Sequence, residues 1–405
     1  MRQHLHLLIV DRASRLALAA EIADRWFLPI VTTGEHARAG LAVLRWCDST
    51  GVAGTVAGQW LGRMRPDAID WLVAVDSTRQ PDVSGALEWM PWSRLASSPA
   101  LDGYQSWAIR RVLEERLSPG VNGPFGTLGW LAAVRRWIQE VCRASVVSVV
   151  PYRVSAYETT LGARVADRDI YFKGLPPERA CEAHRTRAFA AAEPDTFAET
   201  LALRRFDDGS AWWLTAAVPG RADTAGECTA RELARVQQRL LTSASACSVL
   251  QDLDGEGLLA WVANLLADSP AGLAARERCR RALDSGVKHA WIPMDIDPSN
   301  ALVDEDAQVR FIDIDESYLG PAPLAMALLA RRCGDSRLCR LYEQAWSPPL
   351  GDIDWTDFTI AATAIECWRG MLRVDRNSAR GELIADVAAV RDRIRDRLTA
   401  EIYRR

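Results

Sequence analysis

WIPMDIDPSNALVD, residues 291–304, is followed at residues 309–320 by VRFIDIDESYLG, and the two stretches hold five Asp and one Asn beside short apolar runs. Asp295 and Asn300 are five residues apart, and Asp313 lies thirteen residues beyond Asn300. The apolar runs ALV and VRFI stand between them, and turn-forming residues separate these runs. This pattern predicts a loop followed by a β-hairpin.

The residue types in these stretches indicate a particular chemistry. In phosphoryl transfer, one carboxylate orients or deprotonates the attacking hydroxyl, while a second carboxylate and a side-chain amide hold Mg²⁺ against the nucleotide phosphates. Hard oxygen ligands at adjacent strand ends suit that ion. The segment DPSN alone would be interpreted as an ordinary turn, so the hypothesis depends on the whole set of residues.

The same residues resemble a known family. The run from Asp295 to Asp304 resembles the catalytic loop of the aminoglycoside phosphotransferase family, H-G-D-L-H-P-G-N-h-L-h-D, where h is apolar. FIDIDESYLG resembles that family's I-D-W-D/E segment, the counterpart of the protein-kinase D-F-G. The resemblance implies Asp295 as the catalytic base and Asn300 and Asp313 as Mg²⁺ ligands, with Asp315 nearby.

A kinase-like fold also requires a strand Lys and a helix Glu that together anchor the ATP phosphates. In RDIYFKGLPPERACEAHRTR, Lys173 ends a predicted strand and Glu182 lies nine residues later on a predicted helix. Glu178, earlier on the same predicted helix, is the alternative partner. The only other lysine in the chain is Lys288, which favours Lys173 for this role.

The segment SAWWLTAAVPG is typical of a strand that leads into the linker where such enzymes seat adenine. Ala216 to Val218 would form this hinge, with Ala216 and Val218 as nucleotide-binding positions. The neighbouring Trp212 and Trp213 are interpreted as core and hinge packing rather than as platforms for base stacking.

Several positions depart from the family pattern. Pro293 stands where the family has a loop His that braces the catalytic loop through hydrogen bonds, and a Pro side chain cannot make them. Met294 replaces a Gly, and Asp297 replaces the second His. Asp297 is either an indirect support of the site or a solvated loop residue. Asp304 and Asp306 are predicted to form the hairpin turn.

Composition favours a globular protein. The chain has 405 residues, 49% of them hydrophobic and 25% charged, with a formal net charge of -4, which gives no indication of a nucleic-acid or membrane-surface partner. Its start, MRQHLHLLIVDRASR, reads as neither a signal peptide nor a membrane anchor, so we expect a cytoplasmic enzyme or adaptor. None of the nine Cys forms a C-x-x-C pair, which predicts reduced, mostly buried thiols.

The predicted fold class is α/β (α+β), a two-lobed kinase-like phosphotransferase fold preceded by a further α/β domain. Residues 1–119 mix strand-like runs with one helical stretch, residues 36–50. We expect a helical connector over 120–145, a strand-rich lobe over 146–218 and a helical lobe over 219–405, closed by a long amphipathic helix from 381 onwards.

The N-terminal region has a weaker resemblance, to the strand order of Nudix hydrolases. In the register set by Gly51-Val52, the box positions that want Gly, Glu, Arg and further Glu hold other residues, and only Asp48 remains as a carboxylate. A diphosphate hydrolase needs several carboxylates to hold its cations. The region is therefore interpreted as a catalytically inactive, degenerate Nudix-like domain. It would hold a substrate or partner, or simply brace the lobe that follows.

Taken together, the resemblance implies a phosphotransferase that uses ATP and Mg²⁺ and binds ATP between two lobes. The acceptor would be a hydroxyl of a small molecule, such as an antibiotic, a sugar or an amino acid, or of Ser or Thr in a biosynthetic precursor peptide. The altered loop motivates a second hypothesis, a pseudokinase scaffold that works through a nucleotide or a partner protein without turnover.

Overall fold

The computed structural model describes residues 2–11, 15–23, 25–34, 39–52, 54–64, 68–77, 87–101, 105–106, 109–110, 130–154, 158–266, 269–314, 316–379 and 387–403. They belong to two compact units, which are described separately. Unit 1 comprises Met1–Ala180, Leu201–Leu214 and Val374–Ala389. Unit 2 comprises Cys181–Thr200, Thr215–Arg373 and Val390–Arg405.

Unit 1 begins with a mixed sheet in the order β3-β2-β1-β6-β5, in which β4 also pairs with β1 and β7 with β2. The long strands β1 and β6 run parallel over ten paired residues, and the other pairs are antiparallel. The bounds are β1 Arg2–Asp11, β2 Leu16–Ile22, β3 Arg25–Phe27, β4 Ile30–Gly34, α1 Ala39–Thr50, β5 Gly54–Met64, β6 Ala68–Ser77, β7 Leu87–Pro91 and α2 Trp92–Ala96.

A second sheet of unit 1 has the order β11-β12-β10-β9-β8. Its strands alternate buried and exposed side chains where one face meets the core, as in β10, which places Ile170 and Phe172 inside. The elements are α4 Trp130–Cys142, β8 Val146–Val154, β9 Thr159–Val165, β10 Arg168–Leu175, η1 Pro177–Arg179, β11 Thr200–Arg205 and β12 Ala211–Ala216.

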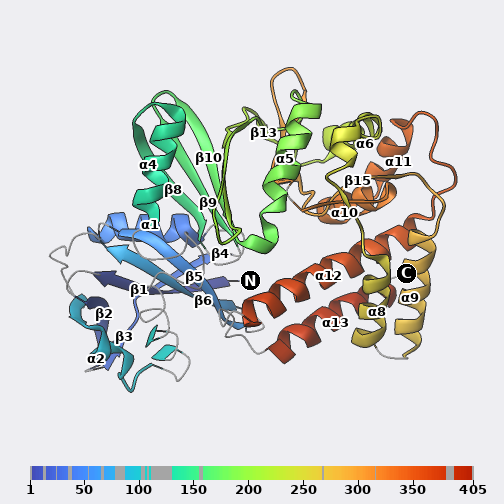
Figure 1. Ribbon diagram of the computed structural model, residues 1–405. Helices are drawn as coiled ribbons and strands as arrows, with labels where there is room; N and C mark the ends of the chain where they lie inside the picture. Colours follow the sequence, from blue (N-terminus) through green and yellow to red (C-terminus); the bar gives the residue numbers. More distant parts are fainter. Residues whose placement is uncertain are drawn as a thin grey trace. The chain divides into compact units, whose positions relative to one another are not determined.

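One apolar core joins the two sheets of unit 1. Val43 and Cys47 of α1 and Val134 and Ile138 of α4 are buried in the same cluster as side chains of both sheets. The Trp137 ring packs on Phe172 with ring centroids 6.1 Å apart. Figure 1 shows α4 lying against β8 and its neighbours. The amphipathic helix predicted between the two strand-rich regions is present as α4, and residues 120–129 of the predicted connector lie outside the described residues.

Unit 2 is mostly helical and holds two small sheets, β13-β16-β17 and β14-β18-β15. Helices α12 and α13 lie side by side, with Gly370 of α12 against Ile394 of α13 (Figure 1). The elements are α5 Cys181–Ala192, β13 Arg221–Ala222, α6 Glu227–Leu240, α7 Ala244–Cys247, β14 Gln251–Asp252, α8 Gly255–Leu266, α9 Pro270–Leu283, β15 His289–Pro293, η2 Pro298–Asn300, β16 Ala301–Val303, β17 Val309–Phe311, β18 Ser317–Pro321, α10 Pro323–Cys333, α11 Arg337–Gln344, α12 Trp355–Ala379 and α13 Val387–Tyr403.

The secondary structure follows the sequence patterns closely. The α/β class is confirmed, as are the loop and hairpin predicted around Asp295 and the helices predicted after residue 219. The helix predicted from 381 is present as α13 from Val387, and residues 381–386 lie outside the described residues. The nine Cys are all free thiols, and burial raises the pKa of Cys279 to about 12. Among the described residues, no helix is both long and apolar enough to cross a membrane.

A buried side-chain amide organises the core of unit 2. Gln237 of α6 is fully buried, and its Nε2 donates to Trp291 O at 2.7 Å and to Ala322 O at 3.2 Å. The Tyr342 hydroxyl donates to Gln237 Oε1 at 2.6 Å. One amide therefore ties together α6, β15, α11 and the start of α10. Since β15 leads directly into the 294–300 loop, this contact sets where the loop begins.

We expect Gln237→Leu to lower the free energy of unfolding by about 3 kcal/mol, because it removes the side-chain partner of the buried Trp291 carbonyl and of the Tyr342 hydroxyl, and one of the donors to Ala322 O. Tyr342→Phe removes one of these bonds and should cost about 1–2 kcal/mol. Urea denaturation followed by Trp fluorescence measures both. Gln251→Leu, at an exposed position of β14, is the control. Equal stability of Gln237→Leu and Gln251→Leu would contradict this account of the core.

Candidate active site

The 294–300 loop is shaped by hydrogen bonds among its own residues. Asn300 Nδ2 donates to Asp295 O at 2.9 Å, and Asn300 N donates to Asp297 O at 2.8 Å. Asp297 Oδ1 accepts from both the amide and the hydroxyl of Ser299, at 2.8 and 2.6 Å, and so caps the short helix η2. Asp297 is thus a local cap in the loop. The sequence pattern alone did not distinguish this role from an indirect support of the site or a solvated loop residue.

Asp313 is placed beside this loop by the β16–β17 pairing. Ala301 pairs with Phe311, and Ile312 N donates to Asn300 O at 2.9 Å. Asp313, the next residue, has a φ of 57°. Asp is among the few residues that tolerate this left-handed conformation, which turns the chain sharply after the hairpin. Asp315 lies outside the described residues.

The other ends of the two segments meet as well. β15 pairs antiparallel with β18, so that Pro293 stands opposite Ser317, and Met294 N donates to Glu316 O at 2.8 Å. Backbone hydrogen bonds therefore join residue 294 to 316 and residue 300 to 312. The structure brings Asp295, Asn300 and Asp313 together in two adjoining loops of unit 2.

The Asp304 carboxylate stabilises the turn of the β16–β17 hairpin. Asp304 Oδ1 accepts from Asp306 N at 3.0 Å and from Gln308 N at 2.9 Å. The turn prediction for Asp304 and Asp306 is confirmed.

Asp295 forms an ion pair with Arg332 of α10. Its Oδ1 lies 3.3 Å from Arg332 Nη1, and the Asp295 side chain remains 40% exposed. On the same helix as Arg332, burial and then the negative charges of Asp223 and Asp297 raise the pKa of the Cys333 thiol to about 11. The thiol is therefore protonated at neutral pH. The Asp295 carboxylate is partly exposed and lies beside the Arg332 guanidinium.

The side chains of Asp313 and Asn300 supply only part of the oxygen ligands that a hard cation needs. Asp313 offers carboxylate oxygens, and Asn300 offers an amide oxygen, because its Nδ2 is oriented by the bond to Asp295 O. Mg²⁺ typically takes one or two protein ligands, with phosphates and water for the rest. Among the residues that the structure describes, no group of three His, Cys, Asp or Glu could hold a metal. The set fits Mg²⁺ that arrives with a phosphate ligand.

Lys173 lies on β10 of unit 1, paired with Thr160 of β9. Its Nζ stands 5.4 Å from the ring centroid of Trp213, a buried residue of β12. A cation over an aromatic face is attracted to it, which helps to fix the extended lysine. Trp212 and Trp213 are 2% and 3% exposed, so their predicted packing role is confirmed.

Glu182 lies in the first turn of α5 in unit 2 and is buried, whereas Glu178 is exposed. The prediction that both share one helix is wrong, because Glu178 belongs to the separate turn η1, which begins at Pro177. A buried carboxylate needs a cation or hydrogen-bond donors more than an exposed one does. Of the two candidates only Glu182 is buried, and its pairing with Lys173 stays a prediction.

The segment predicted as the hinge begins at Ala216, the last residue of β12. Ala216 N donates to Glu199 O at 2.9 Å, and Val218 lies between Ala216 and the turn at Gly220. Beyond it, Arg221 pairs with Val303, and Asp223 N donates to Ala301 O at 3.0 Å. Within unit 2 the chain that leaves the hinge is thus tied to the strand that leaves the Asp295 loop.

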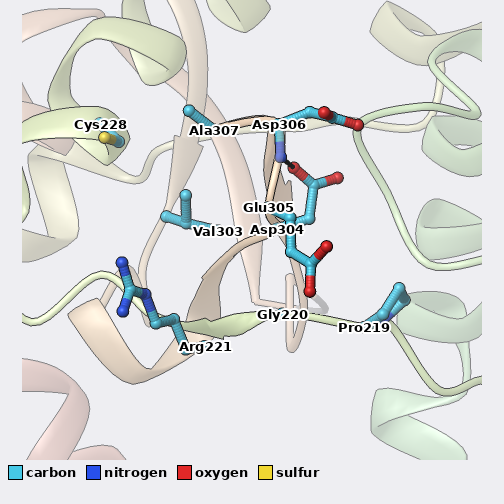
Figure 2. A pocket seen from close by; sticks show the side chains of 9 residues that line it. All are labelled: Pro219, Gly220, Arg221, Cys228, Val303, Asp304, Glu305, Asp306 and Ala307. Carbon is cyan, nitrogen blue, oxygen red and sulfur yellow. Dashed lines mark hydrogen bonds between the residues drawn. The ribbon is translucent and has the colours of Figure 1, made fainter.

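A hollow of about 890 Å³ lies next to this crossing, lined by Pro219–Arg221, Cys228 and residues 303–307. Figure 2 shows Asp304 turned back onto the hairpin's own main chain, while the Arg221 side chain points away from the carboxylates of the turn. None of the predicted site residues lines this hollow. It adjoins the hinge and not Asp295.

Two arginines that no sequence motif indicates contact the loop. Arg332 of α10 and Arg369 of α12 both donate to the main-chain oxygen of Met294, and Arg332 also donates to Ile296 O at 2.6 Å. They lie far from Asp295 in sequence, on two helices of a chain rich in Arg. No spacing rule singles them out.

The chain is similar in structure to several solved phosphotransferases and kinases. No family model matches the chain, and no curated protein matches it. A choline kinase from Streptococcus pneumoniae is 14% identical with a TM-score of 0.49 and covers 67% of this chain and 99% of its own. The GDP complex of aminoglycoside 2'-phosphotransferase-IIIa is 13% identical with a TM-score of 0.48, and the match covers 66% of this chain and 98% of that one. A macrolide 2'-phosphotransferase from Brachybacterium faecium is 18% identical with a TM-score of 0.46, and the match covers 66% of this chain and 97% of that one.

At these TM-scores the class of the fold rests on the strand orders and helices described above. The candidate site likewise rests on the hydrogen bonds that join its two loops.

Proposed function

We propose that the chain is a phosphotransferase that uses ATP and Mg²⁺ to phosphorylate a hydroxyl group. The observation that carries the proposal is the meeting of two loops, one with Asp295 and Asn300 and the other with Asp313, through backbone hydrogen bonds at both ends. A base, a side-chain amide and a second carboxylate are the groups that phosphoryl transfer requires at one place.

Each residue has a defined task in this proposal. Asp295 accepts a hydrogen bond from the acceptor hydroxyl and orients its oxygen for in-line attack on the γ-phosphorus. Asn300 and Asp313 would hold Mg²⁺, which when bound neutralises the charge that develops on the phosphate oxygens. Lys173, held by Glu182, positions the α and β phosphates, and Ala216 to Val218 seat the base, as the sequence motif implies.

The acceptor class follows from the proposed chemistry and the family resemblance. It is a small molecule with a free hydroxyl, such as an antibiotic, sugar, choline or amino acid, or a Ser or Thr of a precursor peptide. The N-terminal region is proposed to be a degenerate Nudix-like domain that braces the following sheet or docks such a peptide. Its mixed sheet and the core shared through α1 and α4 support the bracing role.

A second candidate function is a pseudokinase scaffold. It is favoured by Pro293, which cannot replace a hydrogen-bonding His, and by the ion pair of Asp295 with Arg332. Such a scaffold would bind nucleotide, or a partner protein, without turnover.

Thermal melting with and without nucleotide separates the candidates. At Mg-ATP about 100-fold above its Kd, linkage adds about 2.7 kcal/mol, so we expect Tm to rise by several degrees. The same protein should release ADP when offered aminoglycosides, macrolides, choline, sugars and amino acids in turn. Mg-GTP in parallel decides which nucleotide is used. No shift and no product with either nucleotide would overturn the proposal, and a shift without product would favour the scaffold.

A further inference from the structure

The backbone on both sides of Asp295 is held by two arginine side chains. Arg332 donates from Nη1 to Ile296 O at 2.6 Å and from Nη2 to Met294 O at 3.1 Å. Its guanidinium therefore bridges the carbonyls of the two residues that flank Asp295. Arg369 donates to the same Met294 oxygen, so that this carbonyl accepts two charge-assisted hydrogen bonds.

The two arginines are in turn fixed by carboxylates. Arg332 Nε lies 2.9 Å from Glu366 Oε1 on α12, and Arg369 forms an ion pair with Glu316, whose own carbonyl accepts from Met294 N. All four of these side chains are less than a fifth exposed. A guanidinium held at several nitrogens has little freedom to reorient, so it fixes the groups to which it donates.

The clamp extends from the loop to the last helix. Glu366 Oε2 also lies 2.9 Å from Arg331 Nη2 and 3.0 Å from Arg397 Nη2 of α13. Removing a carboxylate from such a partly buried network leaves guanidinium charges without partners, which costs more than a surface ion pair contributes. Helices α10, α12 and α13 thus meet at one carboxylate that steers Arg332.

From these contacts we propose that Arg332, together with Arg369, is a positioning residue for Asp295. Pro293 cannot brace the loop through a side-chain hydrogen bond, and the two arginines of α10 and α12 hold it instead. The inference rests on the proposed function for its effect on turnover, whereas its effect on loop order is independent of any chemistry. Arg332 also sits 3.3 Å from Asp295 Oδ1, so it fixes the carboxylate itself as well as the adjoining backbone.

Hydrogen exchange of the 294–300 amides tests the clamp directly. In Arg332→Met we expect exchange in this loop to quicken by at least about tenfold, the order expected for lost hydrogen bonds to a charged donor, with the rest of unit 2 unchanged. Arg332→Lys keeps the charge but loses the planar fork, and should restore the exchange rate in part. If Arg332→Met fails to fold, Arg332→Lys alone tests the clamp by the same exchange measurement.

Arg331→Met is the matched control. It removes a guanidinium from the same helix and from the same Glu366, but Arg331 makes no contact with the loop among those described. Its loop exchange should equal that of the wild type. Equal quickening in Arg331→Met and Arg332→Met, or no quickening in Arg332→Met, would overturn the clamp.

Steady-state kinetics gives the second readout. We expect Arg332→Met to lower kcat by about tenfold to a hundredfold with the KM for Mg-ATP unchanged, because the base is misplaced while the nucleotide contacts stay intact. Arg332→Lys should recover part of kcat. A higher kcat in Arg332→Met would mean that Arg332 restrains Asp295 and would overturn the proposal. A protein that turns over no nucleotide, yet shows the local exchange change, would refute the proposed function and leave the clamp standing.

Discussion

Asp295→Asn is expected to reduce nucleotide turnover by about 10²–10⁴-fold, the range typical for a positioned acid-base group, while Mg-ATP still raises Tm as in the wild type. The amide keeps the size of the side chain, and Asn300 contacts the backbone oxygen of residue 295 rather than its carboxylate. The loop should therefore keep its shape. What is lost is the carboxylate that accepts the hydroxyl proton.

Release of ADP measures this effect, with melting in Mg-ATP as the binding readout. Asp306→Asn is the matched control, because Asp306 is an exposed residue of the neighbouring hairpin turn whose backbone amide alone serves the turn. Its turnover should equal that of the wild type. If Asp295→Asn and the wild type release ADP at equal rates, Asp295 is not the base.

The sequence was sufficient for the parts of the fold that local patterns determine. The strand predicted to end at Lys173 is present as β10, and the helical connector expected over 120–145 contains α4. The turn residues between ALV and VRFI predicted the hairpin that brings Asp313 to Asn300. These signals depend on side-chain periodicity within one element, which a single sequence displays directly.

The contacts that support the loop could not be predicted in the same way. Arg332 and Arg369 reach Met294 from two helices that lie 38 and 75 residues further along the chain. Which guanidinium meets which carbonyl depends on how those helices pack, and packing is set by many apolar contacts rather than by a local motif. Asp297 illustrates the same limit at short range, because a cap and a solvated loop residue have the same sequence signature.

Asp313→Asn is expected to abolish the difference that Mg²⁺ makes to nucleotide binding. Removing a contact outside the metal's own ligands costs about 10–100-fold in affinity, so the loss of a charged ligand should weaken the apparent Mg²⁺ affinity by at least about 100-fold. Asn is chosen because residue 313 has a φ of 57°, a conformation that Asn and Asp tolerate and that Ala would adopt only under strain. The variant therefore changes the charge and keeps the turn.

Melting at a fixed ATP concentration over a Mg²⁺ titration, with EDTA as the zero point, measures this dependence. Wild-type protein should gain stability as Mg²⁺ rises, and Asp313→Asn should show the small shift that ATP gives in EDTA at every Mg²⁺ concentration below the millimolar range. Asp304→Asn separates a ligand effect from a general loss of negative charge, because Asp304 is engaged with the hairpin's own amides. An unchanged Mg²⁺ midpoint in Asp313→Asn would remove this residue from the metal site. The adjoining loops would then position the hydroxyl through Asp295 without a cation ligand at 313.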